Sequence, residues 1–263
     1  MNVRPTIDRG AASRRDDQRI LAVASGKGGV GKTWLSITLA QAFARRGKRV
    51  LVFDGDLGLA NIDIQLGLMP ETDLQAVFDG RAGLKAAVMP YRQGGFDLIA
   101  GRSGSGGLAS LPMERLEALC ERLVVLAEDY DHVLIDLGAG VEKSVRQLAR
   151  PASIILVITT DEPTSLTDAY AFIKLTARDH PGADMRIVVN MAQSIGAGEH
   201  TYGTIAKACR NFLKFTPPLA GIVRRDAHVP DCIRHQTPLL SRHPNSEAAG
   251  DVESIVARLL ERT

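Results

Sequence analysis

The stretch that decides the fold reads Ser25-Gly26-Lys27-Gly28-Gly29-Val30-Gly31-Lys32-Thr33. It follows an apolar run at residues 20–24 and precedes a helical pattern at residues 35–40. A glycine-rich loop between a strand and a helix is the setting of a phosphate-binding loop, because glycines let successive backbone N–H groups turn toward one anion. The N-terminal end of the helix adds its positive dipole at the same place. A plain glycine-rich turn would leave the closing Gly-Lys-Thr unexplained, so the stretch predicts a P-loop nucleotide site.

The side chains and backbone of this loop have separate expected roles. Lys32 is expected to reach the β- and γ-phosphates, and the Thr33 hydroxyl to ligate Mg²⁺. We expect the nucleotide to be held by Gly28, Gly29, Val30, Gly31, Lys32, Thr33 and Trp34.

Carboxylates follow two further predicted strands. Asp54-Gly55-Asp56 follows the strand at residues 49–53, and Asp136 follows the strand at residues 132–135. In a doubly wound sheet, ligands bind beyond the carboxyl ends of the strands, so these acids should face the phosphates. Asp136 is in the Walker B position and is expected to hold the Mg²⁺ shell. Asp56 is placed either to orient the attacking water or to hold Mg²⁺ through a water, whereas a single aspartate there would be read as a helix cap.

Strand and helix patterns alternate along the chain, which predicts an α/β fold with one doubly wound, mostly parallel sheet covered by helices on both faces. We expect one ATPase domain over residues 19–263, preceded by a flexible polar arm at residues 1–18. The expected strands are residues 19–24, 49–53, 96–99, 132–135, 153–158, 185–189 and 219–223. The expected helices are residues 32–46, 73–78, 113–128, 141–149, 165–178, 200–212 and 246–262.

Composition narrows the class of protein. A chain of 263 residues with 45% hydrophobic content can bury a large core. The formal net charge is only +2, so no direct nucleic-acid binding is expected. Cys120, Cys209 and Cys232 are far apart without a CxxC pair, which indicates neither a metal cluster nor a disulfide framework and fits a reducing cytoplasm. No apolar run reaches the roughly 18 residues of a membrane span.

Lys27 directly follows Gly26, the first glycine of the loop, at a position where the general P-loop pattern accepts any residue. This lysine narrows the choice among P-loop families. With that lysine the loop resembles the deviant Walker A loop of the MinD/ParA (SIMIBI) ATPases. The resemblance implies that the protein hydrolyses ATP and is a homodimer when ATP-bound, with Lys27 crossing the interface to the second subunit's nucleotide. It also implies that Lys27, Lys32 and Asp56 serve catalysis, Asp56 by positioning the water, with Asp54 and Asn61 in support.

The base that the site accepts is inferred from a missing motif. Guanine-specific relatives carry Asn-Lys-x-Asp after a late strand, whereas here residues 188–192 read Val-Val-Asn-Met-Ala, which favours adenine. By resemblance, Asn190 faces the base and Asp226 lies in a later base-side loop, with Arg224 where the family usually has proline.

Two strings, at residues 58–63 and 159–171, resemble the flagellar-number regulators of the FlhG/FleN type. The resemblance implies an ATP-dependent dimerisation switch that regulates flagellar number and placement. The partners it implies are an FlhF-type GTPase, a flagellar switch-complex component or a flagellar transcription regulator. A MinD-type cell-division ATPase, a ParA-type partitioning ATPase and a non-hydrolysing ATP-binding adaptor remain open alternatives.

The last predicted helix carries an apolar stripe made of Val252, Ile255, Val256, Leu259 and Leu260. The stripe is either a core-packing face or a membrane-targeting face. Core packing is favoured, because the polar face mixes Glu with Arg, whereas helices that bind membrane surfaces prefer Lys and Arg. We therefore expect a cytoplasmic protein, with peripheral contact at the inner face of the cell membrane left open.

Overall fold

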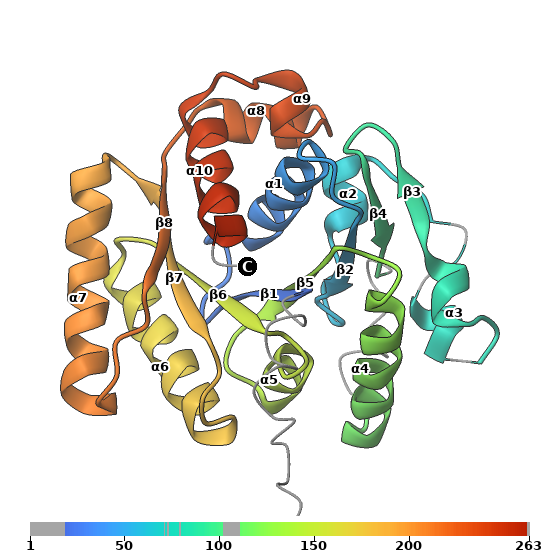
Figure 1. Ribbon diagram of the computed structural model, residues 1–263, viewed down its shortest axis with the longest axis horizontal. Coiled ribbons are helices and arrows are strands. Elements are labelled where there is room, and N and C mark those ends of the chain that lie inside the picture. The colour runs from blue at the N-terminus through green and yellow to red at the C-terminus, as the bar shows by residue number, and fades with distance from the viewer. Residues whose placement is uncertain (1–18, 71, 73, 79, 102–110, 262–263) are drawn as a thin grey trace, which may run out of the picture.

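The computed structural model describes residues 19–70, 72, 74–78, 80–101 and 111–261. Its centre is an eight-stranded sheet in the order β3-β4-β2-β5-β1-β6-β7-β8, with helices above and below it (Figure 1). Only the β3–β4 pair is antiparallel among the strand pairs of this sheet. The predicted doubly wound α/β fold is confirmed. The predicted arm at residues 1–18 lies outside the described residues.

The strands are β1 (Ile20–Ser25), β2 (Val50–Gly55), β3 (Met89–Tyr91), β4 (Phe96–Ile99), β5 (His132–Ala139), β6 (Ile154–Thr159), β7 (Met185–Ala192) and β8 (Leu219–Arg224). The helices are α1 (Lys32–Ala44), α2 (Ile62–Leu66), α3 (Leu74–Phe78), a 3-10 turn η1 (Leu84–Ala87), α4 (Met113–Ala127), α5 (Lys143–Ala149), α6 (Pro163–Asp179), α7 (Ile195–Leu213), α8 (His228–Arg234), α9 (Leu239–Arg242) and α10 (Glu247–Glu261).

The central strands are apolar on both faces because helices cover both faces. Alternate side chains of β1 show this division: Ala22 and Ala24 belong to the core under α3–α7, whereas Leu21 and Val23 belong to the core under α1, α2 and α8–α10. A strand buried on both sides reads as a continuous apolar run, which is why residues 20–24 were recognisable from sequence.

One short strand, three short helices and one helix start differ from the prediction. The strand β3 is an edge strand of three residues with Pro90 in its middle, and a proline is tolerated there because an edge strand leaves one row of backbone groups unpaired. The short helices α2, α8 and α9 were not predicted. The helix α7 begins at Ile195, ahead of the expected residue 200, because the Ser194 hydroxyl caps it by accepting from the Ala197 N–H at 3.1 Å.

The C-terminal helix packs in the core. Its residues Val252, Ile255, Val256 and Leu259 are buried, and α10 lies against β8 and α1 (Figure 1). On its outer side, Glu253 forms an ion pair with Arg46 at the end of α1. The favoured core-packing role of the stripe is therefore confirmed. Within the described ranges, no helix is both long and apolar enough to cross a membrane.

His132 makes the stability of this fold depend on pH. Its ring is buried at the start of β5, 4.3 Å from the ring of Phe43, and burial lowers its pKa to about 4. The unfolded chain takes up a proton near the ordinary pKa of about 6.5, whereas the folded protein holds the ring neutral, so stability is lost as pH falls through that window. We expect His132→Leu to remove this loss and to gain about 2 kcal/mol over the wild type between about pH 7.5 and about pH 5. Urea unfolding of both proteins at the two pH values measures it, and equal pH dependence would contradict it.

Candidate functional site

The loop between β1 and α1 has a backbone that only glycine adopts easily. Gly29 has φ +80° and Gly31 has φ +89°, both in the left-handed region. A Cβ on Gly31 would also meet the amide nitrogen of Asn190 at 2.5 Å. Because Gly31 stands at the N-cap of α1 and no side chain caps that helix, its first backbone N–H groups remain for a ligand. The loop therefore presents an anion site at the end of a 13-residue helix.

Lys32 is buried directly beneath this loop. The residue is only 8% exposed to solvent. Burial lowers the pKa of the ammonium, whereas the nearby carboxylates of Asp136 and Asp56 act in the opposite direction. A compact cation is thus held at low hydration near the loop, which suits it for contact with phosphate oxygens.

Asp136 comes from β5 and meets the start of α1. It lies in register with Val23 of β1, and its carboxylate accepts a hydrogen bond from the Ser36 hydroxyl at 2.9 Å. Burial raises the pKa of Asp136 to about 6, against the opposing effects of Thr33 and Lys32. The structure therefore brings together the hydroxyl and the carboxylate that were expected to hold Mg²⁺. Ser36, which the sequence analysis missed, lies one helical turn after Lys32 and fixes the carboxylate.

Asp54 is the capping member of the two aspartates after β2. One of its carboxylate oxygens accepts from the Asp56 N–H at 3.2 Å, and the other accepts from the N–H groups of Asn61 and Ile62, each at 3.2 Å. Burial and the charge of Asp136, its neighbour in register, raise the pKa of Asp54. Asp54 therefore closes the turn that carries Asp56 and begins α2.

Asp56 is left on the open side of this turn. Its Oδ1 accepts from the Leu59 N–H at 3.0 Å, and a Cβ on Gly138 would lie 3.3 Å from the same oxygen. Asp56 and Gly138 line a cavity of about 160 Å³ together with Glu142. A half-buried carboxylate beside a cavity at the nucleotide edge has the position that a water-orienting group requires.

Lys27 points away from the cluster around Lys32. Its ammonium forms an ion pair with Glu162 and donates to the Thr164 hydroxyl at 2.8 Å. The hydrogen bond from Lys27 lowers the pKa of Glu162. The Lys27 side chain is 34% exposed and that of Glu162 is 60% exposed, so this pair lies on the surface. Glu162 was not singled out from sequence, although it lies within the string at residues 159–171.

The residues expected on the base side are held by the protein itself. The Asn190 amide donates to the Val30 carbonyl at 2.8 Å and so supports the loop from below. Asp226 accepts from the N–H groups of His228, at 2.9 Å, and Ala248, at 3.1 Å, which joins α8 to α10. Contact of Asn190 and Asp226 with a base stays a prediction.

Two neighbours of these residues also have structural contacts. Arg224, which stands where proline was expected, binds Asp251 of α10 through Nε at 3.0 Å. The Trp34 side chain is buried in the core, and its indole N–H has no partner within the described part of the chain. The part of Trp34 that remains for contact with a nucleotide is therefore its backbone N–H, in the first turn of α1.

Comparison with known proteins agrees with this geometry. The profile of the family described as "CobQ/CobB/MinD/ParA nucleotide binding domain" matches residues 21–239. The chain is 36% identical over 231 residues to the antiactivator FleN of Pseudomonas aeruginosa, covering 88% of this chain and 82% of that protein. It is 27% identical over 250 residues to the flagellum site-determining protein YlxH of Helicobacter pylori, covering 94% and 84%. Among solved structures, the septum site-determining protein MinD from Pyrococcus horikoshii, complexed with Mg-ADP, matches with a TM-score of 0.77 at 22% identity, covering 92% and 95%.

The position of Lys32 predicts a direct effect on nucleotide binding. Lys32→Ala removes the one lysine buried beneath the loop, so we expect at least a tenfold loss of MgATP affinity by calorimetry, since hydrogen bonds to charged groups contribute about 1.5–3 kcal/mol. Lys207→Ala, an exposed change on α7, is the matched control and should bind as the wild type does. Equal affinity of Lys32→Ala and wild type would reject the assignment.

Proposed function

Since the chain belongs to the CobQ/CobB/MinD/ParA nucleotide-binding family, we propose that it is an ATP-dependent dimerisation switch that regulates flagellar number and placement. It is a MinD-like P-loop ATPase, an enzyme that hydrolyses ATP to ADP and phosphate. We place the switch in a single domain over residues 19–263.

The observation that carries the proposal is the place of Lys27. A phosphate loop that binds only its own nucleotide needs one lysine. In this chain Lys32, which is buried beneath the loop, supplies it. Lys27 instead lies at the surface, held by Glu162 and Thr164 of the same chain. An exposed ammonium beside the nucleotide edge is placed to meet a second subunit, where a phosphate would compete with Glu162 for it.

The neighbouring surface supports an interface at this edge. Leu59, in the turn that carries Asp56, is 74% exposed, and covering an apolar side chain of this kind stabilises an association. Two such edges facing each other under two-fold symmetry would enclose both nucleotides. Excluding water there strengthens the contacts of Lys27 and Lys32 with phosphate.

Mg²⁺ fits the donor set at this site. The Thr33 hydroxyl and the Asp136 carboxylate would hold it, with Asp56 reaching it through a water. When bound, Mg²⁺ would neutralise charge on the phosphates. Asp56 would orient the attacking water, and loss of the γ-phosphate would release the loops at Asp56 and Gly138.

The flagellar role rests on YlxH, which is named a flagellum site-determining protein, and on the resemblance to the FlhG/FleN regulators, with the antiactivator FleN among the relatives. The string at residues 159–171 that resembles those regulators includes Thr164, one of the groups that hold Lys27. A loop of this kind can report the nucleotide state to partners, which we propose to be an FlhF-type GTPase, a switch-complex component or a flagellar transcription regulator.

The alternative is a MinD-type role at the division site, because the fold matches a solved MinD. Proteins captured by the ATP-locked form would separate the two roles. We further propose a cytoplasmic protein. Peripheral membrane contact would need a surface other than the buried stripe of α10.

The position of Asp56 separates binding from chemistry. Asp56→Ala should keep MgATP affinity within about threefold of the wild type, because other groups hold the phosphates, and should slow hydrolysis by at least about a hundredfold. Calorimetry and phosphate release measure the two effects. Asp129→Ala, an exposed change in the turn before β5, is the control and should leave both unchanged. Hydrolysis by Asp56→Ala at the wild-type rate would assign the water to another residue.

The dimer is tested by mass in solution. Asp56→Ala with MgATP should show twice the monomer mass by light scattering and the monomer mass with MgADP. Adding Lys27→Ala to that variant should abolish the larger species and leave ATP binding intact, whereas adding Lys207→Ala should leave the dimer in place. A strictly monomeric ATP-bound Asp56→Ala protein would reject the switch.

A further inference from the structure

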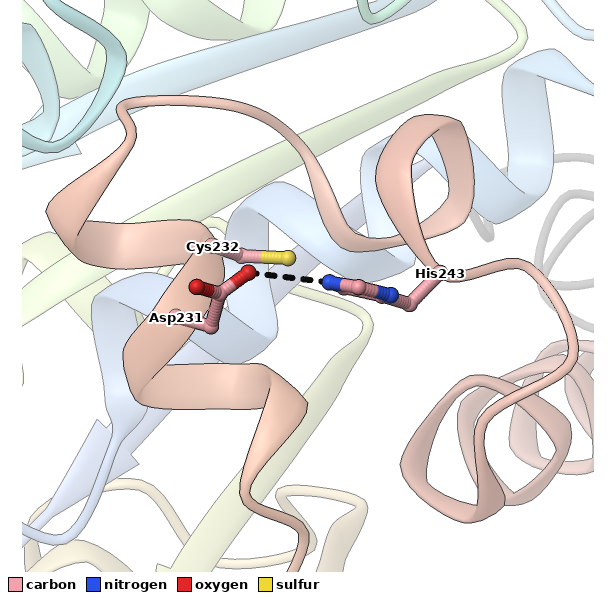
Figure 2. A group of neighbouring side chains, drawn as sticks. All are labelled: Asp231, Cys232 and His243. Carbon is pink, nitrogen blue, oxygen red and sulfur yellow. Dashed lines mark hydrogen bonds and ion pairs between the residues drawn. The ribbon is translucent and has the colours of Figure 1, made fainter.

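We propose that Asp231, Cys232 and His243 form a binding site for a divalent metal ion of the zinc class, separate from the nucleotide site. The three side chains point toward one another from α8 and from the residue that follows α9 (Figure 2). This site goes beyond the ATP switch and does not depend on it.

The ligand atoms need only small shifts to share one ion. The Cys232 sulfur, a carboxylate oxygen of Asp231 and a ring nitrogen of His243 all lie within 4.8 Å of one another. The Nε2 atom of His243 is 2.9 Å from Oδ2 of Asp231. Bonds of about 2.0–2.3 Å from a central zinc would need ligand atoms about 3.3–3.8 Å apart, so small side-chain shifts suffice.

The chemistry of these donors selects the metal. A thiolate, an imidazole and a carboxylate are the three ligand types that zinc takes, whereas Mg²⁺ prefers oxygen alone. Three protein ligands leave a fourth position for water or another side chain. His235 is one candidate for that position, because its Nδ1 atom lies 3.2 Å from Oδ1 of Asp231.

Binding would exchange existing contacts for bonds to the metal. The His243–Asp231 hydrogen bond would open, and the thiol of Cys232 would release its proton to solvent as the sulfur binds the cation. Arg242 donates to Oδ2 of Asp231 at 2.6 Å and would remain behind the carboxylate as an orienting group. Its positive charge opposes the metal, but the thiolate and the carboxylate together balance the two charges of the ion.

The burial of the three ligands leaves a path for the ion. Cys232 is 2% exposed and lies at the base of the site. The side chains of Asp231 and His243 are 32% and 28% exposed and lie at its mouth. A metal entering past them would join α8 to the end of α9, just after the loop that contains Asp226, and would stabilise this segment against unfolding.

The two other cysteines provide the contrast. Cys120 and Cys209 are also buried, yet neither belongs to a comparable group of potential ligands in the part of the chain that the structure describes. The spacing of the three cysteines in the sequence could not reveal this site, because two of its three ligands are not cysteines.

Cobalt is a probe that reports the sulfur ligand directly. The metal-free full chain, with excess MgADP to fill the nucleotide site, is titrated with Co²⁺, and the thiolate-to-cobalt charge-transfer absorption is recorded. We expect one equivalent to give this absorption and one equivalent of Zn²⁺ to remove it. Cys232→Ser should abolish the absorption, and His243→Ala should weaken Co²⁺ binding at least tenfold. The matched control Cys209→Ser should keep both the absorption and the Co²⁺ affinity of the wild type.

The outcomes are decisive in either direction. No charge-transfer absorption in the wild type, or an absorption that survives Cys232→Ser, would overturn the proposal. Circular dichroism checks that each variant is folded, and Cys232→Ala replaces the serine variant if the hydroxyl prevents folding. Lys32→Ala, which is expected to lose ATP affinity, should bind Co²⁺ as the wild type does, so failure of the metal site and failure of the ATP switch are distinguishable.

Discussion

Three ionisable side chains are buried together where β2 and β5 end and α1 begins, and each depends on the others. Lys32, Asp54 and Asp136 are at most 8% exposed. An isolated charge in such a place costs several kcal/mol, so the group is tolerated only because hydroxyls, backbone N–H groups and the opposite charges compensate it. The glycine loop, the uncapped start of α1 and the turn that carries Asp56 are all built around this cluster. Bound MgATP would complete the compensation, which gives the empty protein a physical reason to bind it.

The same arrangement separates the two lysines of the loop into different tasks. Lys32 is committed to the buried cluster. Lys27 is committed to Glu162 at the surface, in a contact that costs little to break because both side chains are solvent-exposed. A nucleotide on a second copy of the chain would offer Lys27 a stronger partner. We therefore assign the switch to Lys27. Its weak contact within one chain is exchanged for a charge-assisted contact between two chains.

Much of this was legible in the sequence, for reasons that particular residues make clear. Residues 20–24 form a continuous apolar run because β1 is buried on both faces, and the order of the glycines, Lys32 and Thr33 follows from phosphate chemistry. The capping role of Asp54 was less visible, since Asp54 and Asp56 are the same residue type two positions apart, and only the folded turn shows which one is used by the backbone. Glu162 and Ser36 were missed because their roles come from neighbours 135 and 100 residues away in the chain. The cluster of Asp231, Cys232 and His243 was hidden for the same reason, since α8 and α9 were not predicted.

The central claim is that Lys27 acts on the nucleotide of a second subunit, and mixing two inactive variants tests it most directly. Lys27→Ala keeps Asp56, and Asp56→Ala keeps Lys27, so a mixed dimer contains one site with both groups. If Lys27 acts across the interface, the equimolar mixture should hydrolyse ATP at up to roughly a quarter of the wild-type rate, the value for random pairing, in which half of the dimers are mixed and each mixed dimer has one complete site. A mixture no more active than the two variants measured separately would contradict the account and place the action of Lys27 within its own chain.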